Sequence, residues 1–185
     1  MKLFRSARFA LGLVVLSAAP LAAQQAPPMP KPGPEHEVLK MDVGTWDAVV
    51  EFSMAPGAPP ATSKGVEVST LGCSGLCLIT DFTGEAMGAP FQGHGVMTWD
   101  VGKKKYTGSW TDSMSTGLAI TESTYDPAAK KWTGWMEGPD MTGAVMKTRN
   151  VVDVKDANNR VMTAYATGPD GKEMQVLKIT YVRKK

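Results

Sequence analysis

The chain contains 185 residues, of which 43% are hydrophobic and 21% are charged, and its formal net charge is +2. Because the 20 basic and 18 acidic residues are scattered along the chain, the composition argues against a nucleic-acid-binding protein and against electrostatic attachment to a membrane surface. Length and apolar content instead favour one folded domain with a single core.

The first 23 residues have the layout of a secretory signal peptide. A basic start is followed by an apolar run over residues 9–16 and by small residues up to Ala23. The run is shorter than the about 20 residues of a membrane helix, so we expect cleavage near Ala23 and an exported product, periplasmic or secreted. An uncleaved amphipathic anchor is the alternative. Cleavage removes three basic residues and leaves 17 basic and 18 acidic residues, a net charge of −1.

Residues 24–34 read as a Pro-rich linker, because repeated proline prevents both a helix and a paired strand. Residues 35–185 are then expected to form one domain. It opens with a short amphipathic helix over residues 35–41, which ends before Gly44.

Ten short segments with alternating side-chain character follow the helix, and turn residues such as Gly, Pro, Asn and Asp separate them. The predicted strands are 46–54, 63–71, 76–86, 91–100, 104–112, 118–125, 131–138, 145–154, 160–167 and 173–183. Successive strands with short links indicate an antiparallel meander. A sheet of this size closes or splits, and closure removes its exposed edges, so we predict an all-β, about ten-stranded up-and-down barrel with space for a ligand inside.

The central part of the chain contains Trp99-Asp100, Gly108, Tyr125-Asp126 and, most specifically, the run from Trp110 through Asp112 to Thr116. These residues carry a resemblance to the bacterial family known as domain of unknown function 1579. It extends from Leu39 and the Gly44-Thr45-Trp46 opening, through Arg149, to Thr180-Tyr181 and Arg183. The family name implies no activity.

The same resemblance implies a lipocalin-like (calycin) barrel. In that superfamily a tryptophan near the start of the first strand sits at the closed end, and an arginine of the last strand packs over its face. Trp46 and Arg183 occupy these positions, so we assign them a structural role. A guanidinium over an indole contributes roughly 0.5 to 2 kcal/mol.

Cys73 and Cys77 are a departure from the familiar family pattern. On one continuous strand their Cα atoms would be roughly 13 Å apart, too far for a disulfide, so a turn at Ser74-Gly75 is required. A hairpin-tip disulfide in an oxidising compartment is the favoured interpretation. A redox pair, or a metal site completed by His94, remains the alternative, although a structural zinc site needs four ligands.

His94 lies between Gly93 and Gly95, where backbone can approach a ligand closely. The register that turns Met97 and Trp99 inward places His94 on the outer face, as an exposed strand histidine. An axial haem ligand is the sharper alternative. We otherwise expect no cofactor and no metal.

Aromatic and methionine side chains that share the predicted inner face are candidates for a pocket wall: Phe52, Met97, Trp99, Tyr106, Trp110, Trp132 and Met136. Asp112 shares the face of Trp110, and Glu122 shares the face of Leu118 and Ile120, so either carboxylate is a candidate ligand anchor. Arg149 or a Tyr hydroxyl is then the expected partner. Asp112 with its neighbouring serines is alternatively turn chemistry.

No nucleophile elbow, phosphate loop or paired nucleophile and base occurs in the sequence. The leading hypothesis is therefore an exported barrel that binds a small apolar or amphipathic molecule, and the sequence indicates no particular partner protein. A solid barrel that acts as a structural or protein-interaction module is the alternative. A hydrolase or isomerase that uses Asp112 or Glu122 in the cavity is a weaker one.

Overall fold

The computed structural model describes residues 28–53, 59–168 and 170–185. The predicted signal peptide and its cleavage point at Ala23 lie outside these residues, as does the first part of the predicted linker. The fold below belongs to the compact unit of residues 31–185. Within the described ranges, no helix has the length and apolarity that crossing a bilayer requires.

One short helix precedes ten strands, as the alternation of side chains predicts. Helix α1 spans Pro34–Leu39. The strands are β1 (Gly44–Phe52), β2 (Ala61–Gly72), β3 (Cys77–Ala86), β4 (Ala89–Asp100), β5 (Lys105–Asp112), β6 (Ala119–Asp126), β7 (Lys131–Pro139), β8 (Val145–Asp156), β9 (Asn159–Thr167) and β10 (Glu173–Arg183).

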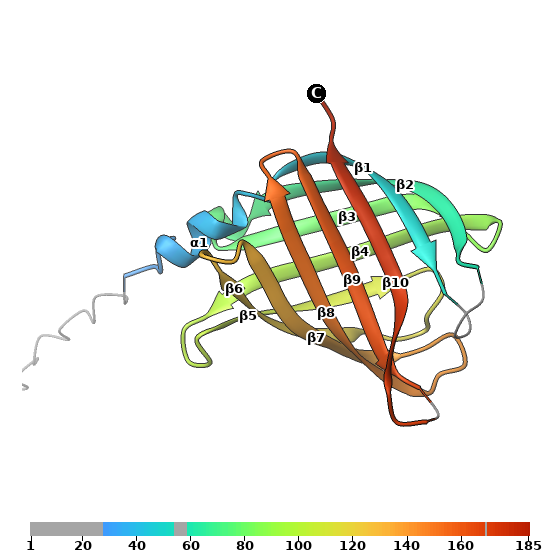
Figure 1. Cartoon of the computed structure of the whole chain (residues 1–185). Coiled ribbons are helices and arrows are strands. Elements are labelled where there is room, and N and C mark those ends of the chain that lie inside the picture. Colours follow the sequence, from blue (N-terminus) through green and yellow to red (C-terminus); the bar gives the residue numbers. More distant parts are fainter. Residues whose placement is uncertain (1–27, 54–58, 169) are drawn as a thin grey trace, which may run out of the picture. The chain divides into compact units, whose positions relative to one another are not determined.

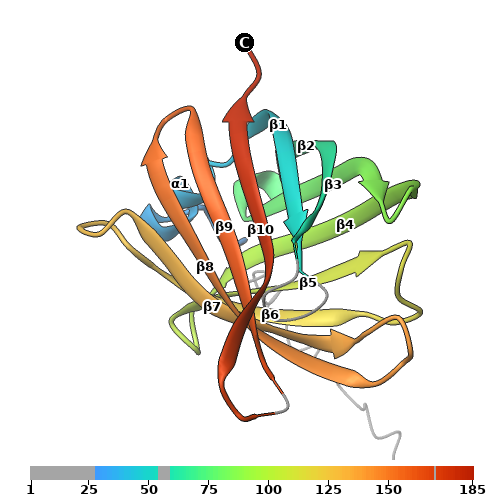
Figure 2. The ribbon, with the colours of Figure 1, turned by 45° about the vertical axis from the view of Figure 1, so that its right-hand side comes forward.

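The strands form a closed antiparallel barrel in which each strand pairs with its neighbours in the chain (Figure 1). Strand β1 also pairs with β10, with Trp46 opposite Arg183 and Phe52 opposite Leu177. The two strands lie side by side in a second view as well (Figure 2). The predicted barrel is therefore confirmed, and its closure leaves no free sheet edge.

The two ends of the barrel differ. At the end where β1 begins and β10 finishes, α1 contacts β3 and β4, and the Tyr106 hydroxyl donates to the Glu35 carbonyl oxygen at 2.9 Å. We call this end the helix end, and the opposite one the far end. Leu39 of α1 is fully buried at the helix end.

Two clusters of buried side chains occupy the inner face. One surrounds Trp46, Ala48, Phe82, Ile179 and Tyr181, with Phe91 and Trp110 packed against it. The other joins α1 to the barrel through Leu39, Leu78, Tyr106 and Trp132, and Met97 and Trp99 pack against it. The barrel wall is thus stabilised from inside by two aromatic groups rather than by one continuous core.

Trp110 explains the two glycines that flank His94. A Cβ atom at Gly93 would lie 2.2 Å from the Trp110 ring, and one at Gly95 would lie 2.9 Å from it. The close approach inferred at these glycines is therefore made by an indole of the neighbouring strand, because a side chain there would displace the ring.

Cys73 and Cys77 form the predicted disulfide, with Cα atoms 5.5 Å apart. The turn between them brings the two residues within reach, because Cys73 and Ser74 both adopt positive φ angles, 52° and 57°. The structure thus supplies the turn that the spacing requires.

The Trp46 indole is held between two guanidinium groups at the helix end. The Cζ atom of Arg183 lies 4.0 Å from the ring centroid and that of Arg160 lies 4.2 Å from it. Arg183 also donates to the carbonyl oxygens of Ala157 at 2.9 Å, of Met41 at 2.7 Å, and of Val43. The last strand is thereby tied to the segment that precedes the first strand.

Arg183→Lys should lower the free energy of unfolding by about 2 to 4 kcal/mol, because an ammonium group does not reproduce the planar fork that reaches three carbonyls and stacks on Trp46. Lys184→Ala is the matched control. It removes an exposed ion pair with Asp47 at 3.2 Å, keeps the backbone hydrogen bond to Thr45, and should cost less than about 1 kcal/mol. Urea denaturation measures both. Equal effects would contradict the structural role of Arg183.

Candidate functional site: an inner cavity beside a buried ion cluster

A cavity of about 220 Å³ lies inside the barrel, toward the helix end. Its apolar wall comes from several strands and consists of Leu78, Met97, Trp132, Val152 and Met162. Its polar wall consists of Asp42, Glu67, Thr80, Arg160 and Tyr181. The cavity therefore joins a mostly apolar space to one concentrated group of polar side chains, which is the usual composition of a small-molecule site.

Arg160 is the centre of the polar wall. Its Nη1 atom donates to Asp42 Oδ1 and its Nη2 atom donates to Glu67 Oε1, and its side chain is only 8% exposed. Asp42 lies between α1 and β1, Glu67 on β2 and Arg160 on β9. We call these three residues the ion cluster. It places two carboxylates on one buried guanidinium, so it carries a net negative charge when both carboxylates are ionised.

The register of the barrel aims these side chains inward. Glu67 pairs with Trp46 across β1 and β2, and Arg160 pairs with Tyr181 across β9 and β10. Because Trp46 and Tyr181 face the interior, their cross-strand partners face it too. The Arg160 guanidinium then stacks on both rings, at 4.2 Å from Trp46 and 4.7 Å from Tyr181.

Burial dominates the proton affinities of this site. It raises the pKa of Glu67 from 4.5 to about 7, against the opposing effect of hydrogen bonds with Tyr181 and Ser69. Ser69 Oγ donates to Glu67 Oε1 at 3.1 Å and lies 3.0 Å from Thr80 Oγ1. Burial also lowers the pKa of Arg160 to about 10 and raises the pKa of Tyr181 well above its ordinary value. Burial thus brings the pKa of Glu67 close to neutral pH.

Met97 is one of two predicted inward-facing residues that line the cavity. Trp99 and Tyr106 pack into the cluster next to it, with ring centroids 4.9 Å apart. Trp110 packs on Gly93 and belongs to the other cluster. Trp132, which we also expected to face inward, lines the cavity directly.

Phe52, Met136 and Asp112 lie on inward-facing register positions but do not line the cavity. Asp112 ends β5 at the far end, where it accepts a hydrogen bond from Trp110 Nε1 at 2.9 Å and one from the backbone N–H of Met114 at 2.8 Å. The structure thus places Asp112 in a turn network, the alternative interpretation of its sequence context.

The prediction that Glu122 faces the interior is wrong. Glu122 pairs with Thr107 and Trp135 on the outer face and binds Lys103 at 2.7 Å and Lys105 at 3.1 Å. These hydrogen bonds lower the pKa of Glu122. The error arose because Leu118 and Ile120 share its face, and both are exposed, Ile120 at 46%.

Arg149 is not the partner of an interior carboxylate. Its Nε and Nη2 atoms donate to the two carboxylate oxygens of Glu173, at 2.8 and 2.7 Å, on the exposed surface.

His94 lies on the outer face of β4, as its register predicts, with Nδ1 2.7 Å from Asp81 Oδ1. Among the described residues, no group of three or more His, Cys, Asp or Glu side chains is arranged to hold a metal ion.

The ion cluster is the part of the site that sequence reasoning missed. Along the chain, Arg160 lies 118 residues from Asp42 and 93 residues from Glu67, so no local motif contains all three. On β2 hydrophobicity alone does not single out Glu67, because the valines that flank it are the more apolar residues. Val68 is 41% exposed, whereas Glu67 and Ser69 are buried. A buried position opposite Trp46 is the signal that would have identified Glu67.

Fold and cavity together define a lipocalin-like barrel. An S-type phycobiliprotein lyase, CPES, from Guillardia theta has a similar structure, with a TM-score of 0.53, 12% identity, and coverage of 82% of this chain and 93% of the lyase chain. A redesigned beta barrel is also similar, with a TM-score of 0.40, 17% identity, and coverage of 80% and 95%.

The chain belongs to the family described as protein of unknown function, DUF1579, whose model matches residues 31–183. The resemblance found in the sequence is therefore confirmed. No curated protein matches the chain.

Arg160→Met should lower the free energy of unfolding by about 3 to 5 kcal/mol, because it leaves Asp42 and Glu67 buried without a cation. Adding Asp42→Asn and Glu67→Gln removes the stranded charges and should recover at least half of that loss. Urea denaturation at neutral pH compares the single and triple variants. If both are equally unstable, lost packing rather than unpaired charge accounts for the effect.

The raised pKa of Glu67 predicts a pH-dependent stability. Because the folded protein binds this proton with a pKa of about 7 and the unfolded chain with about 4.5, the stabilisation is complete below about pH 4.5 and disappears as the pH rises through 7. Relative to Glu67→Gln, whose side chain does not titrate, the native protein should therefore lose roughly 2 kcal/mol of unfolding free energy between about pH 5 and about pH 8. A constant difference, or one of opposite sign, would contradict the assignment.

Proposed function

We propose that the barrel binds a small, largely apolar molecule in the inner cavity, with one polar group against the ion cluster. The observation that carries this proposal is the composition of the cavity wall, in which five apolar side chains face a buried Arg160, Glu67 and Asp42. A space lined in this way both desolvates a ligand and orients it. The lipocalin-like barrel shared with the phycobiliprotein lyase supports ligand binding as the general class of function.

Charge and size narrow the ligand further. Arg160 already contacts two carboxylates, so a third anion in the same buried space would be repelled. A neutral hydroxyl or carbonyl group fits better, because the guanidinium has five N–H donors and Glu67 offers an acceptor or, when protonated, a donor. At about 220 Å³, the cavity is below the roughly 300–1,000 Å³ of drug-sized sites, so the molecule is small.

We also propose that the protein acts after export. The layout of residues 1–23 supports this, and so does the Cys73–Cys77 disulfide, because disulfides persist in oxidising compartments.

The two alternative functions are affected differently by the geometry. A solid structural barrel is disfavoured by the cavity. Asp112 and Glu122, the candidate residues for acid–base catalysis, do not line the cavity. Catalysis would therefore depend on Glu67, whose pKa is about 7. That alternative requires Glu67→Gln to retain binding and abolish turnover.

Binding is tested with naphth-2-ol, an uncharged ring system with one hydroxyl group, and with native mass spectrometry of protein from its own host. Val152→Phe fills the cavity and should weaken naphth-2-ol binding at least about tenfold, measured by fluorescence titration. Val151→Phe, the adjacent position on the outer face of β8, is the control and should bind normally. The proposal would be contradicted if both variants bound naphth-2-ol equally and native mass spectrometry found no ligand on the protein from its own host.

A further inference from the structure

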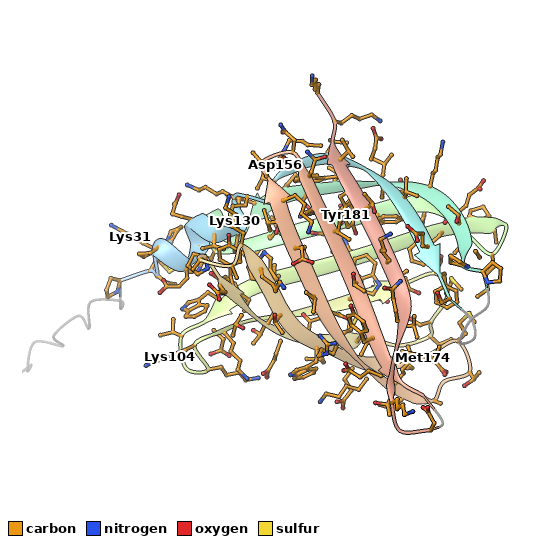
Figure 3. All side chains as sticks on the ribbon, viewed as in Figure 1. Lys31, Lys104, Lys130, Asp156, Met174 and Tyr181 are labelled. Carbon is orange, nitrogen blue, oxygen red and sulfur yellow. A yellow bond between two sulfur atoms is a disulfide. The ribbon has the colours of Figure 1, made fainter. Side chains whose placement is uncertain are left out.

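A second cavity, of about 350 Å³, lies at the helix end on the outer side of the ion cluster. It is bounded by the segment between α1 and β1 and by the turns that join β6 to β7 and β8 to β9. Asp42 and Arg160 line both cavities, so the ion pair between them forms the partition. We call this second cavity the helix-end pocket. Lys130 and Asp156, two of its residues, both lie at the α1 end of the barrel (Figure 3).

The helix-end pocket has an apolar wall. Met41, Trp46, Tyr125 and Val154 line it. Tyr125 is fixed against Trp132, with ring centroids 5.0 Å apart, and Trp46 is fixed between its two guanidinium groups. These rings are held in place by the barrel, so an apolar group that enters the pocket meets a preformed surface.

The positive charges of the pocket fall into two groups, because Arg160 is bound by Asp42 and Glu67 within the ion cluster, whereas Lys130 and Arg183 lie outside that cluster. Lys130, Arg160 and Arg183 line it together with two carboxylates, Asp42 and Asp156. Asp42 is bound to Arg160. Asp156 accepts hydrogen bonds from the Asn158 backbone N–H at 2.7 Å and from Asn159 Nδ2 at 2.9 Å. These bonds lower the pKa of Asp156, and the nearby charge of Lys130 adds a smaller effect.

The cationic side chains of Arg183 and Lys130 lack close carboxylate partners. The hydrogen bonds of Arg183 go to three backbone carbonyls, so its charge is solvated by dipoles and not neutralised by a carboxylate. Across the described residues, neither side chain has a carboxylate oxygen within the 4.0 Å of an ion pair. The Lys130 carbonyl accepts from the Val154 N–H at 2.9 Å, so its side chain projects from fixed backbone at the pocket rim.

From two cations without an ion-pair partner, Lys130 and Arg183, beside a fixed apolar wall, we propose that the helix-end pocket binds an organic anion. Its apolar ring or chain lies on Tyr125, Val154 and the edge of Trp46, and its charge lies near Lys130. A charged group at the rim keeps part of its hydration while its apolar part is buried. This site differs from the inner cavity in its ligand, because the inner cavity has two carboxylates on its one cation. The two sites are therefore distinguishable with one pair of probes.

Naphthalene-2-sulfonate and naphth-2-ol share their rings and differ in charge, so we would titrate both by isothermal calorimetry. Val154→Phe fills the helix-end pocket and should weaken sulfonate binding at least about tenfold, whereas Val152→Phe, two residues away on the same face, fills only the inner cavity and should not. Naphth-2-ol binding should be weakened by Val152→Phe and not by Val154→Phe. With two probes and two variants, failure of binding in the inner cavity is distinguished from failure of binding in the helix-end pocket.

Lys130→Ala should weaken sulfonate binding about fivefold and reduce its salt dependence. Lys104→Ala is the matched control and should change binding less than about twofold. Lys104 also has a positive φ, 52° against 50° for Lys130, and lies on the turn between β4 and β5, away from Lys130 (Figure 3). Because both lysines are exposed, these variants decide the outcome even if Val154→Phe does not fold.

Three results would overturn the proposal. The first is no saturable sulfonate binding up to about millimolar concentration. The second is loss of binding in Val152→Phe with retention in Val154→Phe, which would place the anion in the inner cavity. The third is an equal effect of the two lysine variants, which would indicate nonspecific attraction.

Discussion

The structure depends on the stack of Arg183, Trp46 and Arg160 at the helix end of the barrel. Arg183 comes from the last strand and Trp46 from the first, so their contact accompanies the pairing that closes the sheet. Arg160 continues the stack on the other face of the indole and reaches Asp42 and Glu67. Closure of the barrel and assembly of the ion cluster are therefore consequences of the same few contacts.

Stability alone does not account for the ion cluster. Removing two carboxylates and a guanidinium from water costs several kcal/mol per ion, and apolar residues of similar volume are often as stable or more so in such a position. Here the excess carboxylate is accommodated by proton uptake, since burial raises the pKa of Glu67 to about 7. An arrangement that is costly to bury and lines two cavities is better explained by recognition than by packing.

The sequence was sufficient for the fold and insufficient for the site. Alternation of side chains, with turn residues between the segments, located all ten strands to within a few residues of their observed bounds. Choosing the inner face by hydrophobicity failed on β6, where the exposed Ile120 shares the outer face with Glu122. The ion cluster was missed for a different reason, because Glu67 and Arg160 are buried in the lumen against partners far away in the chain. Local patterns contain no information about such partners.

The position of the ion cluster also explains why the lumen is not filled. The large aromatic side chains gather into two clusters, one around Trp46 and Phe82 and the other around Tyr106 and Trp132. The inner cavity lies between them, since Tyr181 of the first cluster and Trp132 of the second both line it. Closing this gap would press apolar rings onto the polar side chains of Glu67 and Arg160 that line it, and each polar group left buried without a partner costs about 1 to 3 kcal/mol. The cavity is thus the space that a barrel must leave beside buried charges.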